Sequence, residues 1–177
     1  MSFYEKYILP TFLNCACGAK PILYQRGKVI PLAEGLVLEV GIGSGLNIPF
    51  YDAAKVAKVV GLDPSAELNQ MAEKVVSKTA ADNGLLVEII LGSAEAMPFP
   101  DDHFDTVVIT YTLCTIPDAL AANREIRRVL KPNGKLIFCE HGLAPDAGVA
   151  KWQGRIDPYW GQNCRRLPSQ SRYSRVD

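Results

Sequence analysis

The chain has 177 residues, and its 19 lysines and arginines balance its 19 aspartates and glutamates. This length favours a single domain with a substantial buried core. Balanced charge provides no global field that would attract nucleic acid or an anionic membrane. Composition therefore argues against a nucleic-acid-binding protein and favours small substrates of neutral or mixed charge.

Localisation and metal content follow from what the sequence lacks. No apolar run approaches the roughly 20 residues of a membrane span, and Glu5 and Lys6 stand where a signal peptide would be apolar. We expect no integral membrane segment and a cytoplasmic protein. The five cysteines show no C-x-x-C spacing, and only two histidines accompany them. We expect reduced, mostly buried thiols and no metal site.

Residues 1–35 differ in character from the rest of the chain. Their apolar side chains recur at helical spacing, while three prolines divide the region into short pieces. The apolar residues are Phe3, Tyr4, Tyr7, Ile8, Phe12 and Leu13, and the prolines are Pro10, Pro21 and Pro31. We expect an N-terminal helical lid whose aromatic side chains either close over a ligand or pack in the core.

Residues 36–142 alternate short β-branched runs with longer helical patterns, which indicates a parallel sheet with crossover helices. The expected strands are residues 37–40, 59–62, 87–91, 106–110 and 135–139. Three helices are expected. The first begins after Gly45 and ends at Tyr51, the second spans residues 66–83 after a Ser65 cap, and the third spans residues 119–130. A turn at 131–134 then precedes the fifth strand. Residues 143–177 read as an irregular basic tail that is disordered from about Pro168 on.

The first expected strand leads directly into a glycine-rich loop. Residues 37–45 read VLEVGIGSG, with Gly41, Gly43 and Gly45 at alternate positions. Glycines allow a sharp turn and the close approach of a ligand to bare amides. Asp63 follows by roughly the 20 residues expected of an acid that binds a ribose. The motif predicts a nucleoside-containing ligand.

The spacing of the loop distinguishes between two nucleoside cofactors. A dinucleotide fingerprint requires a third small residue where this chain has Leu46, which argues against NAD. Glu39 before a short G-x-G-x-G resembles the S-adenosylmethionine loop of class I methyltransferases. Three later segments strengthen that resemblance: residues 92–99 (GSAEAMPF), 99–105 (FPDDHFD) and 128–134 (RVLKPNG). They resemble the type 11 and quinone-biosynthesis methyltransferases, over about residues 35–142.

This resemblance implies an α/β Rossmann-like doubly wound sheet with strand order 3-2-1-4-5, and S-adenosyl-L-methionine as cofactor. It implies that Asp63 holds the ribose hydroxyls and that Glu39 positions the methionine ammonium or the loop. Ser93, Ala94 and Glu95 would line the adenine pocket. The full set of implied cofactor contacts is Glu39, Gly41, Gly43, Gly45, Asn47, Asp63, Pro64, Ser65, Ser93, Ala94, Glu95 and Thr110.

A narrower resemblance concerns the methyl acceptor. The segment 112–116 (TLCTI), the pair Glu140-His141 and residues 152–160 are similar to the methyltransferase-like branch whose animal members methylate alkyl thiols. Those members carry an N-terminal membrane anchor, which we do not expect in this chain. Their Gly-Gly-Cys segment appears here only as residues 162–167 (QNCRRL). A thiol must lose its proton to attack, so His141 is the expected general base or orienting group, unless it only holds the loop. Tyr111 would border the reacting methyl.

The family fold ends with an antiparallel hairpin beside the fifth strand, and no apolar run after Leu167 supplies it. We expect that hairpin to be missing, which leaves residues 136–139 on an open edge where a second copy could pair in a homodimer. A small-molecule methyltransferase, with a thiol as one acceptor, is the leading interpretation. A phospholipid, amine or quinone methyltransferase, and an inactive or dimer-dependent cofactor-binding remnant, stay open as alternatives.

Overall fold

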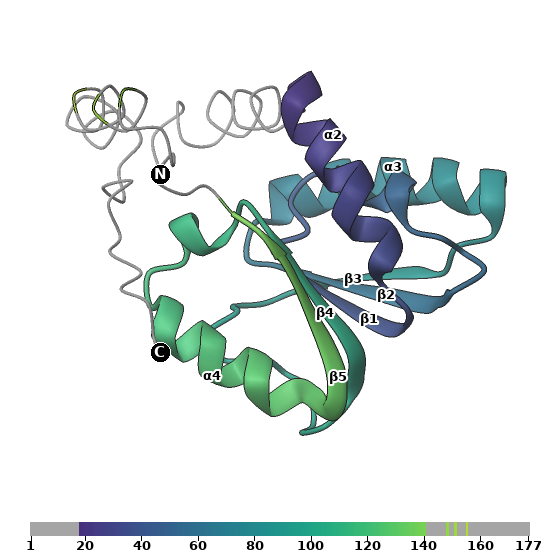
Figure 1. Cartoon of the computed structure of the whole chain (residues 1–177). Coiled ribbons are helices and arrows are strands. Elements are labelled where there is room, and N and C mark those ends of the chain that lie inside the picture. Colours follow the sequence, from purple (N-terminus) through teal and green to yellow (C-terminus); the bar gives the residue numbers. More distant parts are fainter. Residues whose placement is uncertain (1–17, 141–147, 149–150, 152–154, 156–177) are drawn as a thin grey trace.

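The computed structural model describes residues 18–140 and the separate positions Gly148, Lys151 and Arg155. The aromatic stripe of the expected lid, His141 and almost all of the basic tail lie outside these residues, as does the segment where a final hairpin would stand. The described part is a five-stranded parallel sheet with helices on both faces (Figure 1).

The sheet consists of β1 (Gly35–Val40), β2 (Val56–Asp63), β3 (Val87–Leu91), β4 (Phe104–Thr110) and β5 (Leu130–Cys139). Its order is β3-β2-β1-β4-β5, and all four neighbouring pairs run parallel. The helices are α2 (Lys20–Val29), α3 (Ala66–Asn83) and α4 (Ala119–Val129), with short 3-10 helices η2 (Ile30–Leu32), η3 (Ile48–Phe50) and η4 (Leu113–Thr115). The doubly wound fold and its strand order are confirmed.

Two apolar layers hold the helices to the sheet. On one face, α2 and α3 cover the inner side chains of β1, β2 and β4, among them Val37, Val59 and Val108. On the other face, α4 packs through Ala122, Ile126 and Val129 onto residues that include Leu38 and Val107. Strands buried on both sides need this continuous apolar sequence, which is why β1, β2 and β4 were readable from pattern alone.

The helix expected between Gly45 and Tyr51 is wrong: only the three-residue η3 forms there. Pro49 has no N–H to donate to the Gly45 carbonyl in an α-helix that starts after Gly45, and Tyr51 is already extended at ψ 136°. Asp52 then accepts a hydrogen bond from the Ala54 N–H at 3.0 Å, a turn that leads the chain into β2.

Two other boundaries differ from expectation. Pro21 was expected to divide the N-terminal region, yet it lies in the first turn of α2, where a missing N–H costs nothing. The Lys131–Gly134 segment was expected as a turn before the fifth strand. It lies within β5 instead, as an irregularity between Leu130, which pairs with Phe104, and Lys135, which pairs with Thr106.

Candidate cofactor site

The carboxyl ends of β1 and β4 lie side by side at the point where the strand order reverses, which is where doubly wound sheets bind their ligands. The glycine loop leaves β1 there and folds back on β2, because the N–H groups of Gly41 and Ile42 both donate to the Leu62 carbonyl, at 2.7 and 3.3 Å. The loop is thereby fixed over the end of the sheet.

The glycines of the loop have different tasks. A Cβ on Gly41 would collide with the Thr112 side chain, and one on Gly45 would lie 2.7 Å from the Ile48 Cδ1. Gly43 has a φ of +56°, yet a Cβ there would meet nothing closer than the Gly41 carbonyl oxygen at 4.0 Å. Gly41 and Gly45 are therefore required for packing within the protein, whereas Gly43 faces open space that a ligand can occupy.

Asp63 ties this loop to the end of β2. Its Oδ2 accepts from the Gly43 N–H at 3.0 Å and its Oδ1 from the Ser65 N–H at 2.8 Å. Burial raises the pKa of this carboxyl, and the two N–H donors act in the opposite direction. Each oxygen keeps a further lone pair, so the carboxylate can still accept ribose hydroxyls.

Ser65 and Pro64 follow Asp63 at the start of α3. The Ser65 Oγ accepts from the Leu68 N–H at 3.2 Å, which confirms the expected helix cap. Pro64 is exposed, and Ser65 is half-buried. The Ser65 hydroxyl thus already has a structural partner, and its contact with the cofactor stays a prediction.

Beneath the loop lies a buried polar network centred on Glu39, which is 2 % exposed. Its Oε1 accepts from the Asn47 Nδ2 at 2.9 Å and its Oε2 from the Tyr51 hydroxyl at 2.7 Å. Asn47 also donates to the Thr110 Oγ1 at 2.9 Å. The Arg26 Nη1, from α2, donates to the Asn47 Oδ1 at 2.6 Å and to Thr110 at 2.8 Å.

The network brings three predicted site residues, Glu39, Asn47 and Thr110, into one hydrogen-bonded group, and it adds two that sequence reasoning missed. Arg26 lies in the region expected as a lid, and an isolated arginine in a helix normally indicates a solvated face. Tyr51 was expected only as the end of a helix. Neither carries a sequence signal of burial.

Burial raises the pKa of the Glu39 carboxyl to about 7, although hydrogen bonds from Tyr51 and Asn47 and the charge of Arg26 oppose the shift. The unfolded chain releases this proton near pH 4.5, whereas the folded chain keeps it up to about pH 7. Stability therefore falls as pH rises between these values, and the penalty is complete above the folded pKa. It amounts to about 3 kcal/mol.

A Glu39→Gln variant cannot ionise at this position and so lacks this penalty. We expect its free energy of unfolding, relative to the unaltered protein, to rise by about 3 kcal/mol between about pH 5 and about pH 8. Urea unfolding at several pH values measures the difference. Parallel stability profiles for the two proteins would contradict the raised pKa.

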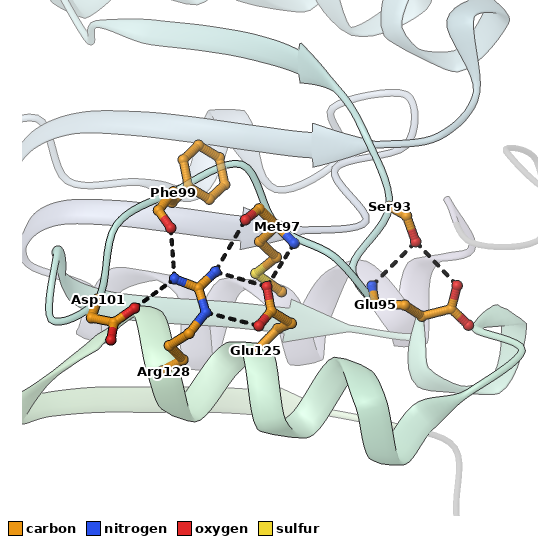
Figure 2. A network of polar contacts seen from close by, with 7 residues as sticks. All are labelled: Ser93, Glu95, Met97, Phe99, Asp101, Glu125 and Arg128. Carbon is orange, nitrogen blue, oxygen red and sulfur yellow. Dashed lines mark hydrogen bonds and ion pairs between the residues drawn. The ribbon is translucent and has the colours of Figure 1, made fainter.

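The loop after β3 contains the predicted adenine-pocket residues, and α4 holds it in place (Figure 2). The Ser93 Oγ accepts a hydrogen bond from the Glu95 N–H at 3.1 Å, and the Ser93 hydroxyl donates one to the Glu95 Oε2 at 3.1 Å. The other carboxylate oxygen of Glu95 accepts from the Asp118 N–H, at the start of α4, at 2.6 Å. Glu95 therefore serves to shape the loop, and Ala94 packs partly buried against the core.

The other end of the loop is fixed by Arg128 of α4, whose contacts with Met97, Phe99, Asp101 and Glu125 are drawn in Figure 2. Its guanidinium donates to the carbonyls of Met97 at 3.0 Å and Phe99 at 2.7 Å, and pairs with Asp101 and Glu125. Hydrogen bonds from Arg128 lower the pKa of Glu125 to about 2, so the pair stays ionised at all physiological pH values. The segment 128–134, which resembles a family motif in the sequence, thus begins with Arg128, the residue that holds the loop after β3.

The ends of β4 and β5 form the side of the site where an acceptor would lie. Tyr111 has a φ of +54°, an uncommon conformation for a side chain of this size. Its hydroxyl accepts from the Cys139 thiol at 3.3 Å, and burial raises its pKa to about 12, so the phenol stays protonated. The Glu140 Oε1 accepts from the N–H groups of Thr112 at 2.8 Å and Leu113 at 3.1 Å, which joins the two strand ends.

A doubly wound parallel sheet with a glycine loop after its first strand and an acid at the end of its second defines the α/β proteins that bind nucleoside-containing cofactors. A family model described as a methyltransferase domain matches residues 38–138. The chain belongs to this family, the type 11 methyltransferase domains, and membership implies S-adenosylmethionine as cofactor. The open space at Gly43 and the free lone pairs of Asp63 fit such a ligand.

Curated relatives and solved structures agree with this membership. Thiol S-methyltransferase TMT1B of Rattus norvegicus is 36% identical over 138 residues, which cover 74% of this chain and 54% of the relative. Phosphatidylethanolamine N-methyltransferase of Cereibacter sphaeroides is 34% identical, with 70% and 60% covered. The crystal structure of YcgJ from Bacillus subtilis has a TM-score of 0.63 at 28% identity, covering 75% of this chain and 57% of that one. The chain spans about half the length of the curated relatives it matches.

The part of the chain that the structure describes contains neither a membrane-spanning helix nor a cluster of metal-binding side chains. None of the helices described combines the length and apolarity needed to cross a membrane. Within the same part of the chain, no three histidine, cysteine, aspartate or glutamate side chains gather as they would around a metal ion.

Proposed function

We propose that this chain transfers the methyl group of S-adenosylmethionine to a small-molecule acceptor, with a thiol as the first candidate. The observation that carries this is the glycine loop, in which Gly43 opens to free space while its N–H is fixed by Asp63. The cofactor supplies the electrophilic methyl carbon. The protein supplies position and electrostatics, so no covalent nucleophile of its own is required.

A thiol acceptor is favoured by the relatives, because two of those named thiol S-methyltransferases are 36% and 34% identical to this chain. The acceptor would attack as a thiolate, which requires a base near the methyl group. His141 follows Glu140, whose carboxylate is anchored to the end of β4, so the base we propose comes directly after a fixed residue. The protonated phenol of Tyr111 cannot serve as the base, and we propose that it lines the acceptor side.

The role of His141 can be tested with two thiols of different acidity. We expect His141→Gln to slow methylation of a weakly acidic alkyl thiol by about 100-fold, because general-base catalysis contributes at least that much. An acidic aryl thiol is already ionised at neutral pH and should be affected far less. His103→Gln is the matched control, because His103 is exposed and precedes the amino end of β4, whereas the site lies at the carboxyl ends of the strands. An equal loss with both thiols would exclude His141 as the base.

The acceptor class itself is tested by offering a thiol, an amine, a phospholipid and a quinol to the protein with radiolabelled S-adenosylmethionine. Phospholipid and quinone acceptors stay open because relatives named for both exist, at 34% identity each. Methylation of the thiol alone supports the proposal. Methylation of a different acceptor instead would identify that compound's class as the substrate class. Calorimetric titration with S-adenosylmethionine and with NAD accompanies the assay. Binding of S-adenosylmethionine without any turnover would indicate an inactive remnant. Binding of NAD but not of S-adenosylmethionine would overturn the proposed function.

We further propose that the protein works in the cytoplasm and that the outer edge of β5 pairs with a second copy. Among the described residues β5 is an edge strand of the sheet, and an edge strand presents unpaired N–H and C=O groups to which another strand can pair. Leu136 and Phe138 of this strand are 44% and 65% exposed. Light scattering of the purified chain tests the pairing, which a monomeric mass at high concentration would exclude.

A further inference from the structure

The acceptor-side segment, residues 111–118 between β4 and α4, is held near both ends by carboxylates from other elements. At one end the Glu140 Oε1 accepts from two main-chain N–H groups of the segment, at 2.8 and 3.1 Å. At the other end the Glu95 Oε1 accepts from the Asp118 N–H at 2.6 Å. The main chain of this segment is therefore tied both to the end of β5 and to the loop after β3.

The loop that carries Glu95 begins beside Asp63, the acid at the end of β2. Leu91, the last residue of β3, pairs with Asp63, and the Gly92 N–H donates to the Asp63 carbonyl at 3.2 Å. A nucleoside whose ribose is bound by Asp63 would therefore have its base within reach of this loop. The loop borders the cofactor space on one side and, through Glu95, contacts the acceptor-side segment on the other.

Both oxygens of the Glu95 carboxylate are engaged within the protein. The Ser93 hydroxyl donates to Oε2 at 3.1 Å, and the Ser93 Oγ accepts from the Glu95 N–H, so the side chain is oriented by a closed turn of its own loop (Figure 2). A shift of the loop must move this carboxylate with it. The contact with Asp118 is open to water, because Glu95 is only half-buried and Asp118 is exposed. Its strength therefore depends on how firmly the loop and the segment are positioned.

We propose that Glu95 is a positioning residue that couples the two sides of the site. A cofactor that orders the loop after β3 fixes the Glu95 carboxylate, which then fixes the acceptor-side segment through the Asp118 N–H. This inference rests on the proposed cofactor and is independent of the chemical class of the acceptor. Coupling between two binding sites is reciprocal, so an acceptor that orders the segment strengthens cofactor binding by the same factor. The acceptor then binds more tightly to the cofactor-loaded protein than to the free protein.

Amide hydrogen exchange, measured with and without saturating S-adenosylmethionine, tests this coupling. The readout is the N–H groups of Thr115 and Ile116, which donate to carbonyls within the segment at 2.8 and 3.4 Å. They keep these partners when Glu95 is replaced, so a change in their exchange reports the order of the segment. We expect the cofactor to slow this exchange by about 10-fold in the unaltered protein, within the usual range of coupling between sites. Glu95→Ala, saturated with cofactor, should lose most of this slowing.

Two further variants separate the contact from a general loss of charge. Glu95→Gln has the same shape and keeps an oxygen that can accept from the Asp118 N–H, so it should retain part of the slowing. Glu88→Ala is the matched control, because it removes an exposed carboxylate of β3 whose partner is Lys58. This control should show the full slowing of the unaltered protein.

The outcomes distinguish this coupling from the proposed function. If S-adenosylmethionine binds but leaves the exchange unchanged, or if Glu95→Ala keeps the full slowing, Glu95 only shapes its own loop and the coupling alone is overturned. If Glu95→Ala fails to fold, Glu95→Asp decides, because its carboxylate is one methylene shorter and should not reach Asp118. An undiminished slowing in that variant overturns the coupling. If calorimetry detects no binding of S-adenosylmethionine to the unaltered protein, the cofactor assignment fails, and the coupling fails with it.

Discussion

Replacing Gly43 by valine is expected to weaken S-adenosylmethionine binding by at least about 100-fold, or about 3 kcal/mol. The reason is steric. Gly43 faces free space in the protein, so an added side chain would take up the room that the ligand requires. The valine must also adopt a φ of +56°, which costs about 1–2 kcal/mol of stability.

Gly84→Val is the matched control, because it introduces the same backbone strain away from the cofactor site. Gly84 has a φ of +75° at the end of α3, and an added Cβ would meet nothing within 4 Å. The two variants should lose similar stability in urea unfolding, yet only Gly43→Val should lose cofactor binding in calorimetric titration. Equal affinities in the two variants would contradict the assignment of the loop as the cofactor cradle.

The sequence indicated the parts of the fold that depend on local pattern. β3 was predicted at residues 87–91 and forms at Val87–Leu91, and α3 forms at Ala66–Asn83 after the Ser65 cap, as expected. Both rest on hydrophobic periodicity and on short-range chemistry at the ends of elements. The helix expected after Gly45 failed because Pro49 and the turn at Asp52 outweighed the apolar pattern.

The residues of the site show the same difference between local pattern and contacts over long sequence distances. Glu39 and Asp63 could be located because each stands at a fixed distance from the glycines, in a strand whose other residues are apolar. Arg26 could not, since it is 21 residues from Asn47 and 84 from Thr110, and only the packing of α2 on the sheet brings the three together. Contacts between distant elements leave no periodic signal in a single sequence.

Asp63 is the residue whose substitution should reveal how the ribose is held. Asp63→Asn should weaken S-adenosylmethionine binding by about 100-fold or more, because each hydroxyl bound to a charged acceptor contributes about 1.5–3 kcal/mol. The amide also turns one oxygen into a donor that faces the N–H of Gly43 or Ser65, so the loop itself would loosen.

A cofactor analogue that lacks the 2′-hydroxyl separates these two effects. The unaltered protein should bind the analogue more weakly than the parent cofactor, while Asp63→Asn should hardly distinguish them, as a double-mutant cycle between residue and ligand would show. Asp52→Asn is the matched control, because Asp52 makes the same kind of turn contact, with the Ala54 N–H, at a partly exposed position. An unchanged preference for the hydroxyl in Asp63→Asn would mean that this carboxylate fixes the loop alone, and that the ribose is held elsewhere.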